Sequence, residues 1–231
     1  MKKALCLFLV VMMLVGLCGC FFDTDPEDVR GQVNSGSNNA STDKNEEPED
    51  KEPEFSIGNV GNSTYTNSFL GLSCTLPAEW VFYTDEQMRE MNNIMEDTLD
   101  EDVAEQLKNA TIVYDMFATV ANEGNSINVN MEKFSALQMA TLNVKTVLES
   151  QIDTIISTYE NMGYTNVRVV YEKVTVDGKE FDGLRLSGQI QGIDFYANVF
   201  AFTKGNYMAN ISIFSLLTDK TEEFLGYFTV E

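Results

Sequence analysis

The sequence contains no histidine, and this absence excludes several classes of site at once. Ser-His-Asp and Cys-His catalysis both require an imidazole base, and histidine-type zinc sites require an imidazole ligand. The sequence also lacks a Walker phosphate-binding loop and a GxGxxG dinucleotide-binding motif. We therefore expect no cofactor, and the enzyme chemistry that stays open is a carboxylate-only mechanism such as glycoside hydrolysis.

Cysteines and basic residues are scarce as well. Three of the four cysteines lie within the first twenty residues, which leaves only Cys74, so an exported form has no internal disulfide. A nucleophilic Cys74 would need a base, and we interpret it instead as a small hydrophobic residue of a strand. Fifteen Lys and Arg residues face 36 Asp and Glu residues, giving a net charge of −21. A chain with this much negative charge repels phosphate groups, which argues against nucleic acid as a partner.

What the chain does have is an N-terminal export signal. Two lysines precede an apolar run over residues 4–18, about 15 residues against the roughly 20 that span a bilayer, so a transmembrane helix is the less favoured interpretation. The run ends in Leu17-Cys18-Gly19-Cys20, which is similar to the lipobox of bacterial lipoproteins. This resemblance implies a signal peptide at 1–19, cleavage before Cys20 and lipidation of Cys20.

The lipidation also predicts where the protein resides. Two or more acyl chains on one residue give stable membrane attachment, whereas a single chain gives only marginal binding. We therefore expect a protein of the cell membrane that is lipid-anchored and faces the extracytoplasmic side. Phe21 follows the cysteine, which leaves sorting between two membranes open.

Residues 20–62 show no hydrophobic periodicity. Residues 31–41 are rich in Gly, Ser and Asn, and residues 46–54 form an acidic run that contains two prolines. Such a composition buries too little apolar surface to offset the entropy of ordering, so the sequence predicts a disordered acidic tether over 20–62. The tether spaces the domain from the membrane; docking of its acidic run on a basic partner is the alternative.

Residues 63–231 are predicted to form one α+β domain with a mainly antiparallel sheet. One strand is expected to have a clean polar side facing solvent, because Asn128, Asn130 and Glu132 alternate with apolar residues. The expected elements are a hairpin of 65–67 with 72–76, helices near 84–95 and 100–109, strands at 111–121 and 127–132, a helix over 141–162, a four-stranded meander from 167 to 215, and a last helix capped by Thr218.

Three features of this domain resemble the PsbP-like family: Leu76-Pro77-x-x-Trp80 with the residues just before it, the long middle helix, and the closing strand with Gly205-Asn206-Tyr207-Met208. The resemblance implies an α/β/α sandwich around an antiparallel sheet. It also implies a non-enzymatic binding module, because members of the family bind other proteins. No functional residue of the family can be carried over, since the family has no catalytic motif.

Two groups of residues are weak candidates for sites. An acidic cluster could hold a cation, although it departs from the EF-hand spacing, and acidic residues at the start of a helix are also favoured by the helix dipole. An aromatic group could be an exposed interaction patch or part of the core. The acidic cluster comprises Glu96, Asp97, Asp100, Glu101 and Asp102, and the aromatic group comprises Trp80, Phe82 and Tyr83.

The leading functional hypothesis is a membrane-tethered lipoprotein whose domain binds another protein or a component of the cell envelope, without enzymatic activity. Two alternatives remain open. One is a carboxylate-based hydrolase of envelope glycans, and the other is a lipoprotein that binds a small ligand or a metal ion.

Overall fold

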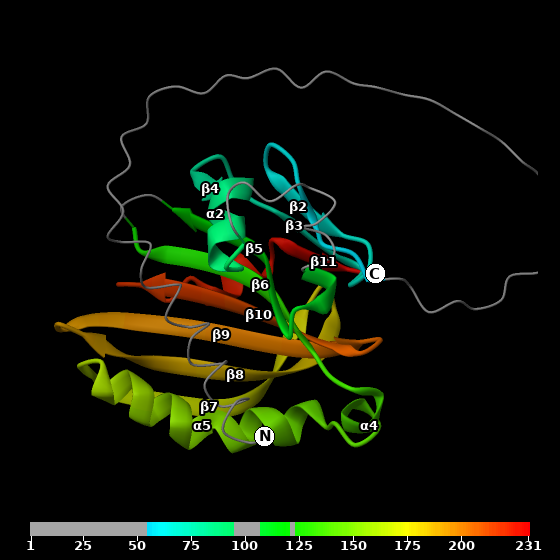
Figure 1. The fold of residues 1–231 in the computed structure, drawn as a ribbon. Coiled ribbons are helices and arrows are strands. Elements are labelled where there is room, and N and C mark those ends of the chain that lie inside the picture. Colours follow the sequence, from blue (N-terminus) through cyan, green and yellow to red (C-terminus); the bar gives the residue numbers. More distant parts are fainter. Residues whose placement is uncertain (1–54, 95–106, 121–122) are drawn as a thin grey trace, which may run out of the picture.

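The computed structural model describes residues 55–94, 107–120 and 123–231, which form two antiparallel β-sheets accompanied by helices (Figure 1). The smaller sheet has four strands in the order β1-β2-β3-β11. Its strands are β1 Asn59–Val60, β2 Thr64–Asn67, β3 Leu72–Thr75 and β11 Phe228–Val230. The predicted hairpin of 65–67 with 72–76 is confirmed as β2 and β3.

The larger sheet has seven strands in the order β4-β5-β6-β10-β9-β8-β7, with antiparallel pairing throughout. Its strands are β4 Trp80–Phe82, β5 Ile112–Val120, β6 Asn125–Lys133, β7 Tyr164–Val176, β8 Lys179–Ile190, β9 Ile193–Lys204 and β10 Tyr207–Leu216. Strands β7 to β10 form the predicted meander. Its first turn, Asp177-Gly178, has φ angles of 50° and 74°, the positive values that a tight hairpin turn requires. The α+β class is confirmed.

The helices are α2 Asp85–Met91, α4 Ala136–Met139, α5 Val144–Asn161 and α6 Thr221–Leu225. Side chains cap the starts of α2, α4 and α5, whereas no side chain caps the start of α6. Thr84 and Gln87 form the predicted capping box of α2. The long helix α5 begins later than residue 141, because the Asn143 side chain accepts a hydrogen bond from the Thr146 N–H at 2.9 Å and so fixes the start.

The last helix also begins later than predicted, and Thr218 does not cap it. The main-chain oxygen of Thr218 instead accepts a hydrogen bond from the Ser215 hydroxyl at 2.6 Å. The N-cap of α6 is Lys220, which makes no side-chain capping bond, and Asp219 Oδ1 just before it accepts from the Thr221 N–H at 3.1 Å and from the Thr221 hydroxyl at 2.6 Å.

Two hydrophobic cores lie on opposite faces of the large sheet. On one, the α5 face, Leu148, Ile155 and Tyr159 of α5 pack on strands β7, β8 and β9. On the other, the small-sheet face, the core includes Tyr65 and Cys74 of the small sheet. Figure 1 shows α5 along the β7–β8 end of the large sheet. The chain is thus an α+β sandwich in which one outer layer is mainly a helix and the other contains a four-stranded sheet.

The domain begins before residue 63, which corrects the predicted boundary. The ring of Phe55 stacks on that of Tyr207 with centroids 4.6 Å apart and meets Phe69 edge-on at 5.6 Å. Strand β1 pairs with β2 in the small sheet. Residues 55–62 therefore belong to the fold. The prediction missed them because Phe55, whose ring packs against the core, directly follows an acidic run.

The signal peptide at 1–19, the lipidation site Cys20 and tether residues 20–54 lie outside the described residues, as does most of the helix expected at 100–109. Among the residues that the structure describes, no helix has the length and apolar character needed to cross a membrane.

Candidate functional site

The predicted aromatic patch is partly core: Trp80 is buried, and Phe82 and Tyr83 are half-buried. Trp80 is 7% exposed, and its ring meets Phe224 edge-on at 4.9 Å and Tyr227 at 6.2 Å. Phe82 is half-buried against the same core. Tyr83 is half-buried with its ring 4.4 Å from that of Phe117. These contacts favour the core interpretation and leave no exposed patch built on Trp80.

The predicted cation site cannot be placed. Its five members, Glu96, Asp97, Asp100, Glu101 and Asp102, all lie outside the described residues. Within residues 55–94, 107–120 and 123–231, no group of three or more acidic or cysteine side chains is arranged to hold a metal ion. Cys74 is buried in the core between the sheets, and burial raises the pKa of its thiol to about 12, so its thiol is inert as expected.

The strand predicted to present a polar side to solvent does not do so. Strand β6 is buried on both faces. Its polar side, together with polar residues of β10, forms a group that we call the polar row. The polar row consists of Asn128, Asn130, Glu132, Asn210 and Ser212, which are only 0–7% exposed. The sequence showed the alternation correctly, but alternation identifies two faces without showing that the polar one meets water.

The register places the polar row on the α5 face of the large sheet. Asn130 lies opposite Asn210, and Asn128 lies opposite Ser212. Within β10, these two residues alternate in phase with Met208, which belongs to the core under α5. Side chains two residues apart on a strand share a face, so the row and the α5 core occupy the same side.

Several atoms of the row have unmet hydrogen-bonding capacity. Asn130 Nδ2 donates to the main-chain oxygen of Asn210 at 2.9 Å. Four other atoms, however, have no hydrogen-bond partner in the described part of the chain: Asn128 Oδ1, Glu132 Oε2, Asn210 Oδ1 and Ser212 Oγ. An unpaired buried polar group costs about 1–3 kcal/mol, and native proteins contain few of them. Four such atoms lie on two adjacent strands, so the polar row is the largest group of them in the described part of the chain.

Glu132 is the only carboxyl group of the polar row. Burial penalises its charged form and raises the pKa of its side chain from 4.5 to about 7. Near neutral pH this carboxyl group therefore exists in both protonation states, and it can donate a hydrogen bond as well as accept one.

Aromatic rings flank the row on the next strand. Tyr114 of β5 lies opposite Asn130, and Phe117 lies opposite Asn128. The ring of Tyr83 continues this wall through its contact with Phe117. Polar groups for orientation beside aromatic surface for contact are the usual composition of a ligand site.

The row lies beyond the strands that α5 mainly covers, which are β7, β8 and β9 (Figure 1). Gln151 is the one polar residue on the buried side of α5, and its Oε1 also has no partner among the described residues. At the β4 edge the same face reaches solvent, because Val81 lies opposite Thr119 and is 59% exposed. The polar row is therefore enclosed, while the β4 edge of the same sheet face is exposed to solvent.

A second buried polar cluster is structural. Asp115 sits at the bulge of β5 and accepts three hydrogen bonds, from Gly58 N at 2.7 Å, Tyr65 Oη at 2.5 Å and Asn67 Nδ2 at 2.6 Å. Burial raises the pKa of Asp115, while these three bonds oppose the shift. Its donors come from the small sheet and from residues next to it, so the cluster joins the two sheets and has little capacity left for a ligand.

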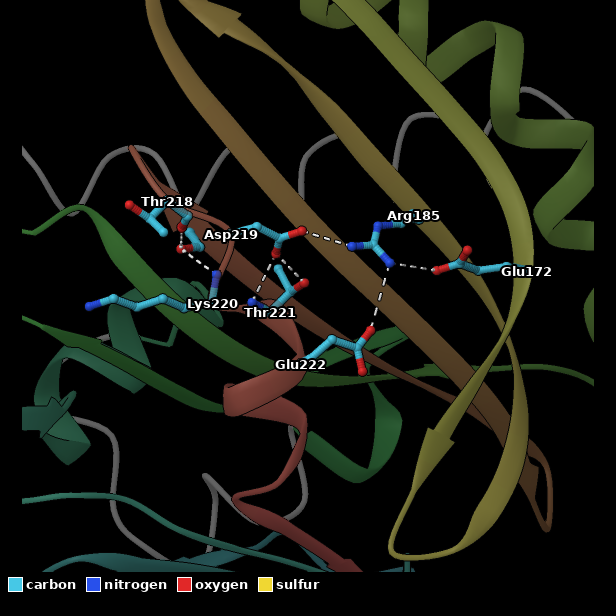
Figure 2. A network of polar contacts seen from close by, with 8 residues as sticks. Glu172, Arg185, Thr218, Asp219, Lys220, Thr221 and Glu222 are labelled. Atoms are coloured by element: carbon cyan, nitrogen blue, oxygen red, sulfur yellow. Dashed lines mark hydrogen bonds and ion pairs between the residues drawn. The ribbon is translucent and has the colours of Figure 1, made fainter.

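A third polar cluster, shown in Figure 2, is structural as well. Arg185 of β8 pairs with Asp219 at 2.7 Å and with Glu172 and Glu222 at 3.7 Å. Its hydrogen bond to Asp219 is the main cause that raises the pKa of Arg185. Asp219 also bonds Thr221, so the network ties the start of α6 to the meander.

No model of a known protein family matches the chain, and no curated protein is similar to it in sequence. Several solved structures resemble it distantly, including the following two. A protein of Bacteroides thetaiotaomicron has a TM-score of 0.37 at 11% identity over 74% of this chain and 48% of its own, so the chain spans about half of that protein. LpqN, a protein involved in cell envelope biogenesis of Mycobacterium tuberculosis, has a TM-score of 0.34 at 8% identity over 67% of this chain and 75% of its own. Likeness at this level assigns no function to the chain.

Proposed function

We propose that this protein is a lipid-anchored binding module of the extracytoplasmic membrane surface, and that its ligand contacts the polar row on the α5 face. The observation that carries the proposal is the group of buried polar atoms in the row that lack hydrogen-bond partners. The location rests on the lipobox ending at Cys20 and on the predicted tether.

The unpaired groups of the polar row lower the stability of the fold. A leucine at Asn128 would fill a similar volume without an unpaired amide, and each unpaired buried group costs about 1–3 kcal/mol. Residues that lower stability without a structural benefit are typical of functional sites, where activity and stability are in conflict. A bound ligand would supply the missing partners.

The chemistry of the row favours binding over hydrolysis. Glycoside hydrolysis requires two carboxyl groups on either side of the bond that breaks, and the polar row contains only Glu132. Asp115, the other deeply buried carboxyl group, is held by donors from the small-sheet side. A phosphate ligand is also disfavoured, because the row has no Lys or Arg and the chain has a net charge of −21.

Site-specific photocrosslinking in cells tests the proposal. A benzophenone amino acid at Val81 lies at the open edge of the α5 face, whereas the same group at Ile193 lies at the tip of the β8–β9 hairpin. We expect adducts from position 81 that are absent from position 193. We also expect them to disappear in Asn128→Leu.

Asn198→Leu is a matched control. Asn198 is as deeply buried as Asn128 and has no partner for either amide atom, but it lies opposite Ile213 on the small-sheet face. This variant should retain the adducts of the unchanged protein. Adducts that are equally strong in all three proteins would show that the polar row does not bind the ligand.

A further inference from the structure

We propose that one end of the large sheet lies on the membrane surface, where Lys133 and Lys204 contact anionic lipid headgroups and Leu137 enters the bilayer interface. We call this part of the molecule the basic end; it comprises the end of β6, the β9–β10 turn and helix α4 (Figure 1). The inference rests on the lipid anchor of the proposed function and concerns a surface distinct from the polar row.

The strand register brings the parts of the basic end together. Lys133 lies opposite Tyr207 on β10, and Tyr207 lies opposite Lys204 on β9, so the two lysines flank one ring across three neighbouring strands. The Lys133 ammonium group lies 5.9 Å from the centre of the Tyr207 ring. The Phe134 N–H donates to the main-chain oxygen of Asn206 at 2.8 Å. The segment that leads into α4 therefore lies beside the β9–β10 turn.

The chain from the lipidation site joins the domain at this same end. Phe55 is the first described residue, and its ring stacks on that of Tyr207 with centroids 4.6 Å apart. A coil of the length predicted for residues 20–54 spans on the order of 30–35 Å. A lipid on Cys20 would thus keep the basic end close to the bilayer, and a weak contact would be enough to orient the domain.

The charge of the basic end is unusual for this chain. Two long segments meet there, residues 133–148 and 195–218, and they contain three lysines and no Asp or Glu, although the whole chain has 36 acidic residues. An anionic surface attracts this end and repels the acidic remainder. The uneven distribution of charge therefore turns the basic end toward an anionic bilayer.

The cations at the opposite end of the sheet are already paired with carboxylates. Lys220 pairs with Glu123 at 3.4 Å, and Arg185 pairs with Asp219 at 2.7 Å (Figure 2). The two lysines of the basic end, in contrast, have no ion pair in the described part of the chain. Their charges are available to the phosphate groups of lipids.

Leu137 gives the basic end an apolar contact. Its side chain is 80% exposed, the largest value among the large hydrophobic residues that the structure describes. Ser135 and Gln138 form a capping box at the start of α4, so Leu137 projects from a hydrogen-bonded turn. Apolar side chains beside lysines are typical of segments that bind at the membrane interface.

Two groups of carboxylates compete with the headgroups for the lysines. Asp177 and Glu180 belong to the β7–β8 turn at the same end of the sheet, and Glu231 follows β11. The acidic run of residues 46–54 directly precedes Phe55 in the sequence. A bilayer differs from these carboxylates because it also accepts an apolar side chain. The exposed leucine of α4 therefore favours the membrane.

Quenching of a fluorophore by a lipid-borne nitroxide tests this inference on the lipidated full chain in vesicles. The vesicles contain phosphatidylglycerol and phosphatidylcholine in equal parts, and the nitroxide sits on an acyl chain near the headgroup. A bimane label is attached to Leu137→Cys or, as a matched control, to Leu217→Cys. Leu217 is 69% exposed and lies at the opposite end, where its N–H bonds Asp194 beside the β8–β9 turn. Cys74 is buried, so the label stays on the introduced cysteine.

We expect the emission of the label at the basic end to fall about twofold in the presence of the nitroxide and that of the control label to change little, because only the basic end is drawn to anionic headgroups. Lys133→Gln combined with Lys204→Gln should remove most of this quenching. Lys173→Gln combined with Lys220→Gln changes the net charge equally and should preserve it. A salt concentration of about 0.5 M should also suppress the quenching, by screening and without a substitution.

Equal quenching of both labels would overturn the inference, because the domain would then have no preferred orientation on the membrane. Absence of quenching at position 137 would overturn it as well, since the competing carboxylates would then hold the lysines. Quenching that persists in vesicles of phosphatidylcholine alone would exclude recognition of anionic headgroups. A protein that does not float with the vesicles at all would overturn the lipid anchor, and this inference with it, so the two failures are distinguishable.

Discussion

Glu132→Gln is expected to change how the stability of the domain depends on pH. Glu132 is 7% exposed, its Oε2 has no partner among the described residues, and burial raises the pKa of its carboxyl group to about 7. In the unfolded chain the same group has a pKa of 4.5. Glutamine has nearly the same shape and no charge, so it removes the titration with little change in packing.

The direction and the size of this change in the free energy of unfolding follow from proton linkage. Between pH 4.5 and 7 the unfolded chain loses the Glu132 proton while the folded chain keeps it, so folding becomes less favourable as the pH rises through this window. One pKa unit corresponds to about 1.4 kcal/mol, which gives a loss of about 3 kcal/mol across the window. Below pH 4.5 both states are protonated and the loss vanishes. The glutamine variant should therefore match the unchanged protein in acid and exceed it by about 3 kcal/mol at pH 8.

Urea denaturation at half-unit steps from pH 4 to pH 8.5 measures this difference. Other titrating groups, including Asp115, contribute equally to both proteins and cancel in the comparison. Asn198→Leu serves as a control that shifts the whole curve without changing its shape. Parallel curves for Glu132→Gln and the unchanged protein would refute the reasoning, because they would show that Glu132 ionises as easily in the folded state as in the unfolded one.

Cys20→Ser should abolish labelling by a fatty-acid probe, and a variant that remains labelled would disprove the lipobox assignment. Removal of residues 55–62 should cost about 2–3 kcal/mol through the lost ring packing and lower Tm by about 5–10 °C, whereas an unchanged melt would restore the boundary at residue 63. Asp115→Ala leaves three donors without an acceptor and should cost about 3–6 kcal/mol in urea denaturation; a loss below 1 kcal/mol would show that water replaces the carboxylate. Arg185→Ala should cost no more than about 1 kcal/mol by the same measurement, because its ion pairs are partly exposed, and a larger loss would mean that they act as one network.

Structural features that depend on a few neighbouring residues could be predicted from the sequence. The turn at Asp177-Gly178 and the capping box of Thr84 with Gln87 depend on a few adjacent residues, and both are confirmed. Of the second sheet only the β2–β3 hairpin was predicted, because β11 comes from a distant part of the sequence and β1 has only two residues. Pairing of that kind depends on tertiary contacts that no single window of sequence contains.

The polar row was missed for a related reason. Asn128 and Asn130 were recognised as one side of a strand, and that side was assigned to solvent because amides usually face water. The structure buries both side chains and places Asn210 of β10 opposite Asn130 across the strand pair, which the sequence of one strand does not reveal. A clue did exist in the sequence: two strands with apolar residues on one side each carry asparagine on the other. Matched asparagines on separate strands are therefore worth testing as an internal site.

The pairing of β11 with β3 bears on the export that we propose for this protein. Residues 228–230 add a strand beside residues 72–75, so the small sheet and the core between the two sheets stay incomplete until the late part of the chain is available. Contacts between distant parts of a chain also slow folding, because the intervening loop must close first. A chain that crosses a membrane through a narrow channel has to remain unfolded during passage. A topology that delays closure until after passage would give such a protein a built-in resistance to premature folding on the wrong side.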